Sequence, residues 1–471
     1  MKNTLIKASA LGVIMAISIS AVRATPLNLP KAAPLDFNPP KGERLVLENG
    51  MTLYLLNDPS LPAIRISAVV RTGTINDPAD KVGLGAITSS MLEDGGSLSY
   101  KPEEIDKTLE YLGASLSSSM DIEDASFSMF ALKKDLDTVL DIYADVLMNP
   151  AFDAEKFKIL KKNEIEMIRR RNDDPGKTVM REALRSYYGK DHPYGRRTEA
   201  AVVESITIAD LKAQHSAYYR PNNIIMAVSG SYGSNEEIVA KLKQRFGKWE
   251  KREIKATKIP PPARNTSRVI YFIDKDVPQT YIAVIQQGIQ RPDTVFFPLG
   301  ITNDVLGAPG LSSRLWDTVR ARKGLAYSVY SSFSRRNAYP GHLYAYCGTK
   351  PETYSQALEE ILKQLKRVKT DPLSAQEVNE AKSAKINSFV FTFKTPFDVV
   401  NQRALLEHFG FQPDYLETYV SNVSAVTPES AFSTATKIFN PDNALIFVIG
   451  NSKKFDRPLS EFGPVTELKE D

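Results

Sequence analysis

The chain has 471 residues, enough for two to four domains, and 42% of them are hydrophobic, as is usual for proteins with packed cores. This composition excludes an intrinsically disordered protein. The 60 lysines and arginines nearly balance the 56 aspartates and glutamates, so the formal net charge of +4 gives no support for nucleic-acid binding. The single cysteine, Cys347, excludes an intrachain disulfide, and its setting in "LYAYCGTK" predicts a buried thiol in a strand rather than a nucleophile.

The first 24 residues are typical of a secretory signal peptide. Lys2 and Lys7 precede an apolar run at 8–22. The segment ends in Ala-Val-Arg-Ala, a small-x-small pattern that predicts cleavage after Ala24. The alternative is a membrane anchor, but the run is shorter than the roughly 20 residues that span a bilayer. We therefore expect export to the periplasm, no stable membrane span, and a mature chain that begins with an arm at 25–43.

Along the mature chain, predicted strands alternate with predicted helices. Residues 45–58, "LVLENGMTLYLLND", place Asn-Gly between two apolar runs, which predicts a β-hairpin. Residues 125–132, "ASFSMFAL", alternate like a strand with one buried face, whereas 133–150 and 153–171 carry apolar residues at helical spacing. Because strands lie next to hairpins and helices cluster between them, the sequence predicts an α+β fold with a mainly antiparallel sheet.

An internal repeat of very long period is the strongest sign of domain organisation. Four landmarks recur in the same order at offsets between 214 and 222 residues. The pairs are "PAIRISAVVRTG" at Pro62 with "PQTYIAVIQQG" at Pro278, "ITSSML" at Ile87 with "ITNDVL" at Ile301, "PAFDAEKF" at Pro150 with "PLSAQEV" at Pro372, and "PNNIIMAVSG" at Pro221 with "PDNALIFVIG" at Pro441. The chain is thus predicted to hold two homologous halves, at 44–250 and 269–471, joined by a charged, proline-rich linker at 251–268.

The segment 82–96, "VGLGAITSSMLEDGG", carries the first chemical signal. Its frame of Gly-Leu, Met-Leu and Gly resembles the zinc-site helix of the pitrilysin/insulinase metallopeptidases, a family that includes the mitochondrial processing peptidases. The resemblance extends over nearly the whole mature chain and implies their LuxS/processing-peptidase-like fold. In that family the helix holds His-x-x-Glu-His. Aligned on the frame, the first His falls on Ala86, the Glu on Ser89 and the second His on Ser90.

These replacements remove the chemistry of a zinc site. Positions 86 and 90 are one helical turn apart, which suits two imidazoles on one ion, but a methyl group and a hydroxyl cannot replace the imidazoles. Ser89 cannot accept a proton from a zinc-bound water as a glutamate does. Glu164 and Glu166 lie roughly where the resemblance implies a third ligand, although a solvated helix face is the favoured interpretation for both. No two of the four histidines stand at ligand spacing, so we expect no metal in this chain.

The second half contains "GLSSRLWDTVRARKGLAYSVYSSF" at 310–333, which looks like the family segment that hydrogen-bonds substrate backbone beside the zinc. Arg320 and Tyr327 match the arginine and the tyrosine of that segment and their spacing. The residues themselves predict a helix to Arg322, a left-handed Gly324 and a following strand. The alternative is structural: Arg320 pairs with Asp317 on its own helix, and Tyr327 is merely half-buried.

The resemblance and the lost motif together predict a division of labour. This chain is interpreted as the metal-free subunit of an exported heterodimeric zinc peptidase, and it contributes the Arg320–Tyr327 clamp and half of a peptide chamber. A homologous partner subunit then supplies the zinc and the general base, and the substrate is a peptide or an unfolded polypeptide. The alternative is a non-catalytic structural or peptide-binding protein, similar to the core subunits of respiratory complexes.

Overall fold

The structure is a computed structural model that describes residues 38–255, 257–262, 267–308 and 312–470. The predicted signal peptide at 1–24 and most of the predicted arm at 25–43 lie outside the described residues. Within these ranges, no helix combines the length and the apolar composition needed to cross a lipid bilayer.

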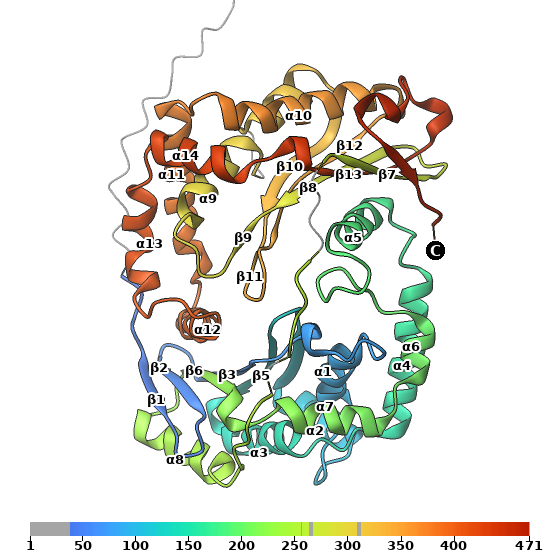
Figure 1. Cartoon of the computed structure of the whole chain (residues 1–471). Coiled ribbons are helices and arrows are strands. Elements are labelled where there is room, and N and C mark those ends of the chain that lie inside the picture. The colour runs from blue at the N-terminus through green and yellow to red at the C-terminus, as the bar shows by residue number, and fades with distance from the viewer. Residues whose placement is uncertain (1–37, 256, 263–266, 309–311, 471) are drawn as a thin grey trace, which may run out of the picture. The chain divides into compact units, whose positions relative to one another are not determined.

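Two six-stranded sheets organise the fold (Figure 1). The first sheet has the order β1 (Glu43–Val46), β2 (Thr52–Asn57), β6 (Ile224–Gly230), β3 (Ala63–Val70), β5 (Ala125–Leu132) and β4 (Ser115–Met120). The second has the order β10 (Ala326–Phe333), β12 (His342–Thr349), β8 (Thr280–Gln287), β13 (Leu445–Gly450), β7 (Val269–Asp274) and β14 (Val465–Glu467). A short parallel pair, β9 (Ile289–Gln290) and β11 (Arg335–Arg336), lies apart from both. The hairpin predicted around Asn49-Gly50 is confirmed, because β1 pairs antiparallel with β2.

The two sheets repeat one pairing pattern. β2 is parallel to β6 as β7 is to β13, and β6 is antiparallel to β3 as β13 is to β8. The antiparallel pairs continue through β5 and β4 in the first sheet and through β12 and β10 in the second. Only the outermost strands next to β2 and β7 differ, since β1 is antiparallel to its neighbour and β14 is parallel. The prediction of two homologous α+β halves with mainly antiparallel sheets is confirmed.

Helices fill the connections of both halves. In the first half they are α1 (Leu84–Asp94), α2 (Pro102–Leu112), α3 (Leu136–Met148), α4 (Ala154–Arg169), α5 (Pro175–Tyr188), α6 (Ala200–Ser205), α7 (Ile208–Tyr218) and α8 (Asn235–Phe246). In the second they are α9 (Phe296–Leu306), a π-helix (Trp316–Arg322), α10 (Tyr354–Thr370), α11 (Ala375–Phe389), α12 (Pro396–His408), α13 (Tyr415–Ser424) and α14 (Pro428–Ile438). Short 3-10 turns occur at Thr74–Asn76, Lys133–Asp135, Pro221–Asn223, Pro351–Thr353, Val390–Thr392, Pro441–Asn443, Ser452–Lys454 and Leu459–Phe462.

The repeated sequence landmarks mark the starts of equivalent elements. Asp153 in "PAFDAEKF" caps α4, because its side chain accepts the first-turn amides of Glu155 and Lys156. Ser374 in "PLSAQEV" caps α11 in the same way through the amide of Glu377. An uncapped helix start leaves backbone donors without partners, so the cap residue fixes where each helix begins.

Each half has its own hydrophobic core between its sheet and its helices. In the first core, Phe127 of β5 stacks on Tyr143 of α3 with ring centroids 5.0 Å apart, and the Tyr143 hydroxyl donates to the Phe127 carbonyl at 2.8 Å. The second core contains Tyr354 and Leu358 of α10 together with Cys347 of β12. Cys347 is a free and fully buried thiol, as predicted, and burial raises its pKa to about 12.

Two helices cross from one half to the other. α12 belongs to the second half by sequence but packs on β2, β6 and β3 of the first sheet, where Val400 and Ala404 are buried beside Ile225. α5 belongs to the first half but packs on β8 and β13 of the second sheet, where Val179 is buried beside Phe447. Figure 1 shows both helices beside the sheets that they cover. Each sheet therefore buries one of its faces against a helix that the other half supplies.

Glu123, in the turn between β4 and β5, gathers polar groups from both halves. Its buried carboxylate accepts the Asn337 amide at 2.8 Å and the Tyr194 hydroxyl at 2.6 Å, and the Arg291 guanidinium lies 3.7 Å away. The Glu123 carbonyl oxygen lies 3.0 Å from Nε2 of His408 at the end of α12. A buried carboxylate is tolerated only where such partners replace water.

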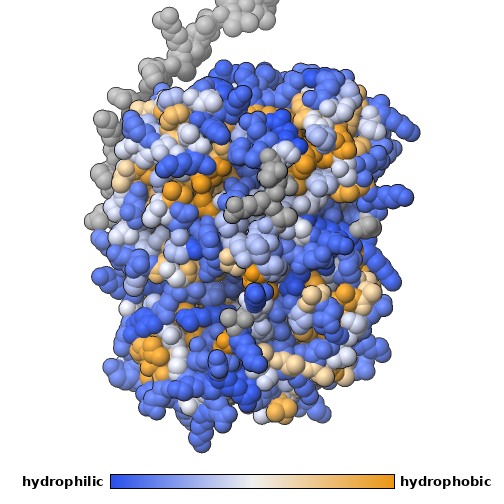
Figure 2. Space-filling model, viewed as in Figure 1, coloured by the Kyte–Doolittle hydropathy of each residue, from blue (hydrophilic) through white to orange (hydrophobic). Residues whose placement is uncertain are grey.

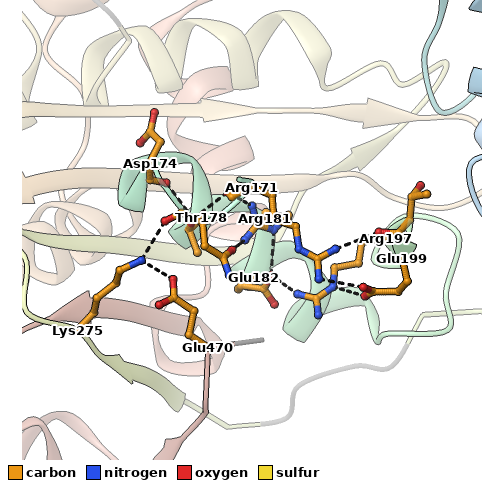
Figure 3. A network of polar contacts seen from close by, with 11 residues as sticks. Arg171, Asp174, Thr178, Arg181, Glu182, Arg197, Glu199, Lys275 and Glu470 are labelled. Atoms are coloured by element: carbon orange, nitrogen blue, oxygen red, sulfur yellow. Dashed lines mark hydrogen bonds and ion pairs between the residues drawn. The ribbon is translucent and has the colours of Figure 1, made fainter. Parts of the chain in front are cut away.

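A second polar network borders α5 (Figure 3). Arg197 donates to Glu182 of α5 at 2.7 Å and to Glu199 at 2.7 Å. Lys275, which follows β7 of the second half, donates to the Asn172 carbonyl just before α5 at 2.9 Å. The segment before α5 is thus bonded by the second half, and the middle of the helix is bonded by its own half. On the face shown in Figure 2, hydrophilic residues predominate and apolar residues form separate patches.

The crossing helices generate a stability prediction. Val179 of α5 and Val400 of α12 are buried between the crossing helices and the sheets. Val179→Ala or Val400→Ala is expected to lower the free energy of unfolding by about 1–3 kcal/mol, because each leaves a cavity in a shared core. Urea unfolding followed by circular dichroism measures this change. Val465→Ala, at a partly exposed position on β14, is the matched control and should shift stability little. Unchanged stability in both buried variants would contradict the assigned packing.

Candidate functional site

The helix with the modified motif, α1, is fixed in place at its start. Gly83 precedes it with φ of 101°, a left-handed conformation that favours glycine. The buried carboxylate of Asp77 accepts the amides of Gly83 and Gly85 at 2.8 Å each, and a Cβ on Gly85 would come within 2.8 Å of that carboxylate. Asp77 therefore caps α1 from outside the helix, and Gly85 leaves room for its carboxylate.

The three motif positions differ in their surroundings. Ala86 and Ser90 are half-buried on the same side of α1, one turn apart. Ser89 is 3% exposed and lies next to the hydroxyl of Tyr219 within the first core. The helix thus keeps the geometry of a ligand pair at 86 and 90, while the side chains at these positions are a methyl group and a hydroxyl.

Glu164 and Glu166 lie on α4, which packs against α1. Glu166 is exposed and pairs with Arg169 at 3.6 Å, as a solvated helix face predicts. Glu164 is half-buried, and desolvation raises the pKa of its carboxyl. Among the described residues, no group of three or more His, Cys, Asp or Glu side chains could hold a metal ion. The donor set at this place does not fit zinc.

Each histidine has a structural role instead. His192 lies 3.0 Å from the Pro260 carbonyl, His215 lies 2.9 Å from the Leu147 carbonyl, and His408 bonds the Glu123 carbonyl as described above. His342 Nδ1 lies 3.1 Å from the Tyr188 hydroxyl. Burial lowers the pKa of all four side chains, so the neutral imidazole is favoured.

The structure brings Arg320 and Tyr327 together. The Arg320 guanidinium carbon lies 5.3 Å from the centroid of the Tyr327 ring, and the Tyr327 side chain is 77% exposed. Gly324 between them is left-handed and β10 follows, as the sequence predicts, but the helix that carries Arg320 is a π-helix. The alternative pairing is wrong, because Asp317 bonds Arg322 at 2.8 Å rather than Arg320.

A β-bulge explains the exposure of Tyr327. Ala326 pairs with Thr349 and Ser328 pairs with Gly348, so Tyr327 has no partner of its own on β12. Bulges re-aim side chains at the edges of sheets. β10 is an edge strand of the second sheet, and Tyr327 therefore projects from an open edge next to the end of the π-helix.

Sequence reasoning missed the equivalent edge of the first sheet. β4 is an edge strand, and its serine-rich sequence "SLSSSM" alternates between exposed and less exposed positions. Edge strands offer unpaired backbone groups to an extended peptide. Glu93 of α1 already accepts the outward amide of Ser118 at 2.8 Å, so one backbone donor of this edge is occupied. The serine-rich sequence of β4 was the available signal.

Comparison with known protein families matches this architecture. A model of the insulinase family, peptidase family M16, matches residues 53–201, and a model described as the peptidase M16 inactive domain matches residues 205–385. The chain belongs to the peptidase M16 family.

Individual M16 proteins resemble the chain along most of its length. An uncharacterized zinc protease of Bacillus subtilis, YmxG, is 24% identical over 86% of this chain and 98% of its own. The mitochondrial-processing peptidase subunit beta of Saccharomyces cerevisiae is 24% identical over 88% of this chain and 89% of its own. A crystal structure of a peptidase M16 inactive domain from Pseudomonas fluorescens, 24% identical, superposes with a TM-score of 0.80 over 89% of this chain and 99% of that one. This M16 chain shares the fold and lacks the zinc motif.

The Asp77 cap generates a prediction about pH. Burial raises the pKa of Asp77 to about 6, above the ~4 expected in the unfolded chain. The folded protein therefore holds this proton more tightly, and the resulting stability is present below about pH 4 and lost as pH rises through about 6. Asp77→Asn cannot titrate, so the difference in unfolding free energy between wild type and variant should change by on the order of 2–3 kcal/mol across this window. Urea unfolding at several pH values measures it, and a constant difference would contradict the assignment.

Proposed function

We propose that this chain is the metal-free subunit of an exported two-chain zinc peptidase of the M16 family. A homologous partner subunit carries the zinc and the general base. This chain contributes a substrate clamp, Arg320 and Tyr327, and part of the surface that encloses the peptide. The observation that carries the proposal is the arrangement of these two side chains: both are exposed and lie against each other.

Arg320 and Tyr327 make few contacts with the rest of the described fold. The Arg320 side chain makes no hydrogen bond or ion pair with a described residue, while the neighbouring Arg322 is bound by Asp317. Guanidinium and phenol groups can donate strong hydrogen bonds to carbonyl oxygens and oxyanions. Exposed donors on and beside an edge strand are available to the backbone of an extended peptide, which is the ligand class that a peptidase fold handles.

Two further observations support the quaternary and cellular parts of the proposal. The yeast relative that aligns with 88% of this chain is named as a subunit, mitochondrial-processing peptidase subunit beta. The sequence at 1–24 is typical of a signal peptide, which supports function in the periplasm. A chain without a fitting donor set for zinc can still take part in zinc-dependent proteolysis if a partner brings the metal.

The first test is metal content. The purified mature chain should bind no stoichiometric zinc after dialysis and should cleave no peptide alone, because Ala86, Ser89 and Ser90 supply neither the two imidazoles nor the carboxylate. Elemental analysis and a peptidase assay with and without chelator make the measurement. Near-equimolar zinc together with chelator-sensitive cleavage would falsify the metal-free assignment.

The second test concerns the clamp. Arg320→Ala and Tyr327→Phe should leave thermal unfolding and partner binding nearly unchanged, because both side chains are exposed. Cleavage by the complex with the zinc-bearing partner should fall roughly a hundred- to a thousand-fold in kcat if the lost donor serves a developing oxyanion. A ground-state contact would appear mainly as a raised KM.

Arg322→Ala is the matched control for this test, since Arg322 is an exposed arginine on the same π-helix that is held by Asp317. Its kinetics should stay near those of the wild type. Unchanged kinetics of both clamp variants in a well-folded complex would remove the clamp and favour the alternative, a structural or peptide-binding role without catalysis.

A further inference from the structure

A groove with both polar and apolar lining crosses one face of the first sheet beside α12. Its larger hollow, of about 390 Å³, is lined by residues that include Arg65, Ser115, Ser117, Ser128, Phe130 and Phe397. A second hollow of about 240 Å³ shares Arg65, Phe130 and Phe397 and continues past the end of β3. The groove is distinct from the Arg320–Tyr327 pair, which lies in the other half of the chain.

The strand register explains why these side chains meet. Ser115 of β4 lies opposite Phe130 of β5, and Phe130 lies opposite Arg65 of β3. One step along, Ser117 lies opposite Ser128. Directly opposed residues in a sheet share a face, so the row spans three strands, or roughly 10 Å. The main contacts of α12 in this sheet are with β2, β6 and β3, and the hollow lies over β4 and β5 beside Phe397 of α12.

The centre of the groove is positively charged because of Arg65. Arg65 is exposed and forms no ion pair or hydrogen bond with a described residue, and its guanidinium carbon lies 5.6 Å from the Phe130 ring centroid. No acidic residue lines the larger hollow. The continuing hollow adds Lys394 and a single acid, Asp58. The ring holds the arginine by a cation–π contact and leaves its planar fork of donors free.

We propose that this groove binds an aspartate or glutamate side chain of a peptide substrate that crosses the β4–β5 face. The proposal deepens the function proposed above, since it rests on a peptide as the ligand. A carboxylate matches the guanidinium fork in shape and charge, and the exposed hydroxyls of Ser115 and Ser117 add neutral donors. The site selects acidic segments and is independent of the partner's metal.

Binding to the mature chain alone tests the site. The test uses two labelled, unstructured peptides, one with a central Asp-Glu pair and one with Asn-Gln in its place. The protein is titrated into each peptide at low salt, and fluorescence anisotropy measures binding. The acidic peptide should bind about tenfold more tightly, with less difference at high salt because the pair is exposed. Arg65→Gln should abolish the difference, and Arg65→Lys should keep part of it because it retains the charge without the fork.

Arg169→Ala is the control, because Arg169 is an exposed arginine on α4, outside the groove, and its variant should behave as wild type. Free glutamate should compete only at far higher concentration than the peptide, which separates a peptide site from a site for a small carboxylate; equal competition overturns the peptide part. Equal affinity for the two peptides, no binding of either, or a preference that survives Arg65→Gln overturns the acidic site. The proposed function fails separately, by unchanged cleavage in the Arg320 and Tyr327 variants.

Discussion

The exchange of helices α5 and α12 between the two halves is the contact on which the rest of the structure depends. Each sheet has one face covered by the helices of its own half and another that is largely apolar near its centre. Val400 and Ala404 of α12 cover that second face in the first sheet, and Val179 of α5 covers it in the second. Burial of apolar surface is the main favourable term in folding, so neither half completes its packing alone.

Polar groups then fix the halves in one arrangement. The apolar contacts under α5 and α12 are not directional, whereas the carboxylate of Glu123 needs the Asn337 amide and the Tyr194 hydroxyl at hydrogen-bonding distance. A displaced half would take the Asn337 amide and the Arg291 guanidinium away from this buried charge, which costs more than the hydrogen bonds gain. The contacts of Glu123 with the second half and the Lys275–Asn172 hydrogen bond therefore specify the arrangement of the halves that the hydrophobic cores stabilise.

This framework also explains how the fold persists without the metal chemistry. The start of α1 is held by Asp77, and Ser89 is packed in the core, so neither depends on a bound ion. In the second half, Arg320 on the π-helix and Tyr327 on the edge strand β10 are both exposed and lie against each other. The zinc ligands of the family motif are absent at positions 86, 89 and 90, whereas the two residues of the proposed clamp are exposed.

The sequence by itself determined the repeat, most elements and the lost motif, because these follow from local spacing. Alternation in 125–132 gives a strand, apolar spacing in 133–150 and 153–171 gives helices, and residues 86 and 90 share a helix face whatever lies around them. The same reasoning located Arg320 and Tyr327 at a helix-to-strand corner.

Only the tertiary structure decided which surfaces meet. The local sequence of α12 does not show that Val400 and Ala404 cover the other half's sheet, because Val399 and Leu406 of the same helix pack in a different cluster. The sequence spacing allowed an ion pair between Asp317 and Arg320. The π-helix instead places Asp317 beside Arg322, five residues on, and Arg320 contacts the ring of Tyr327. The groove at Arg65 likewise depends on strand register between segments that are more than 50 residues apart in the chain, and long-range register is set by packing rather than by local pattern.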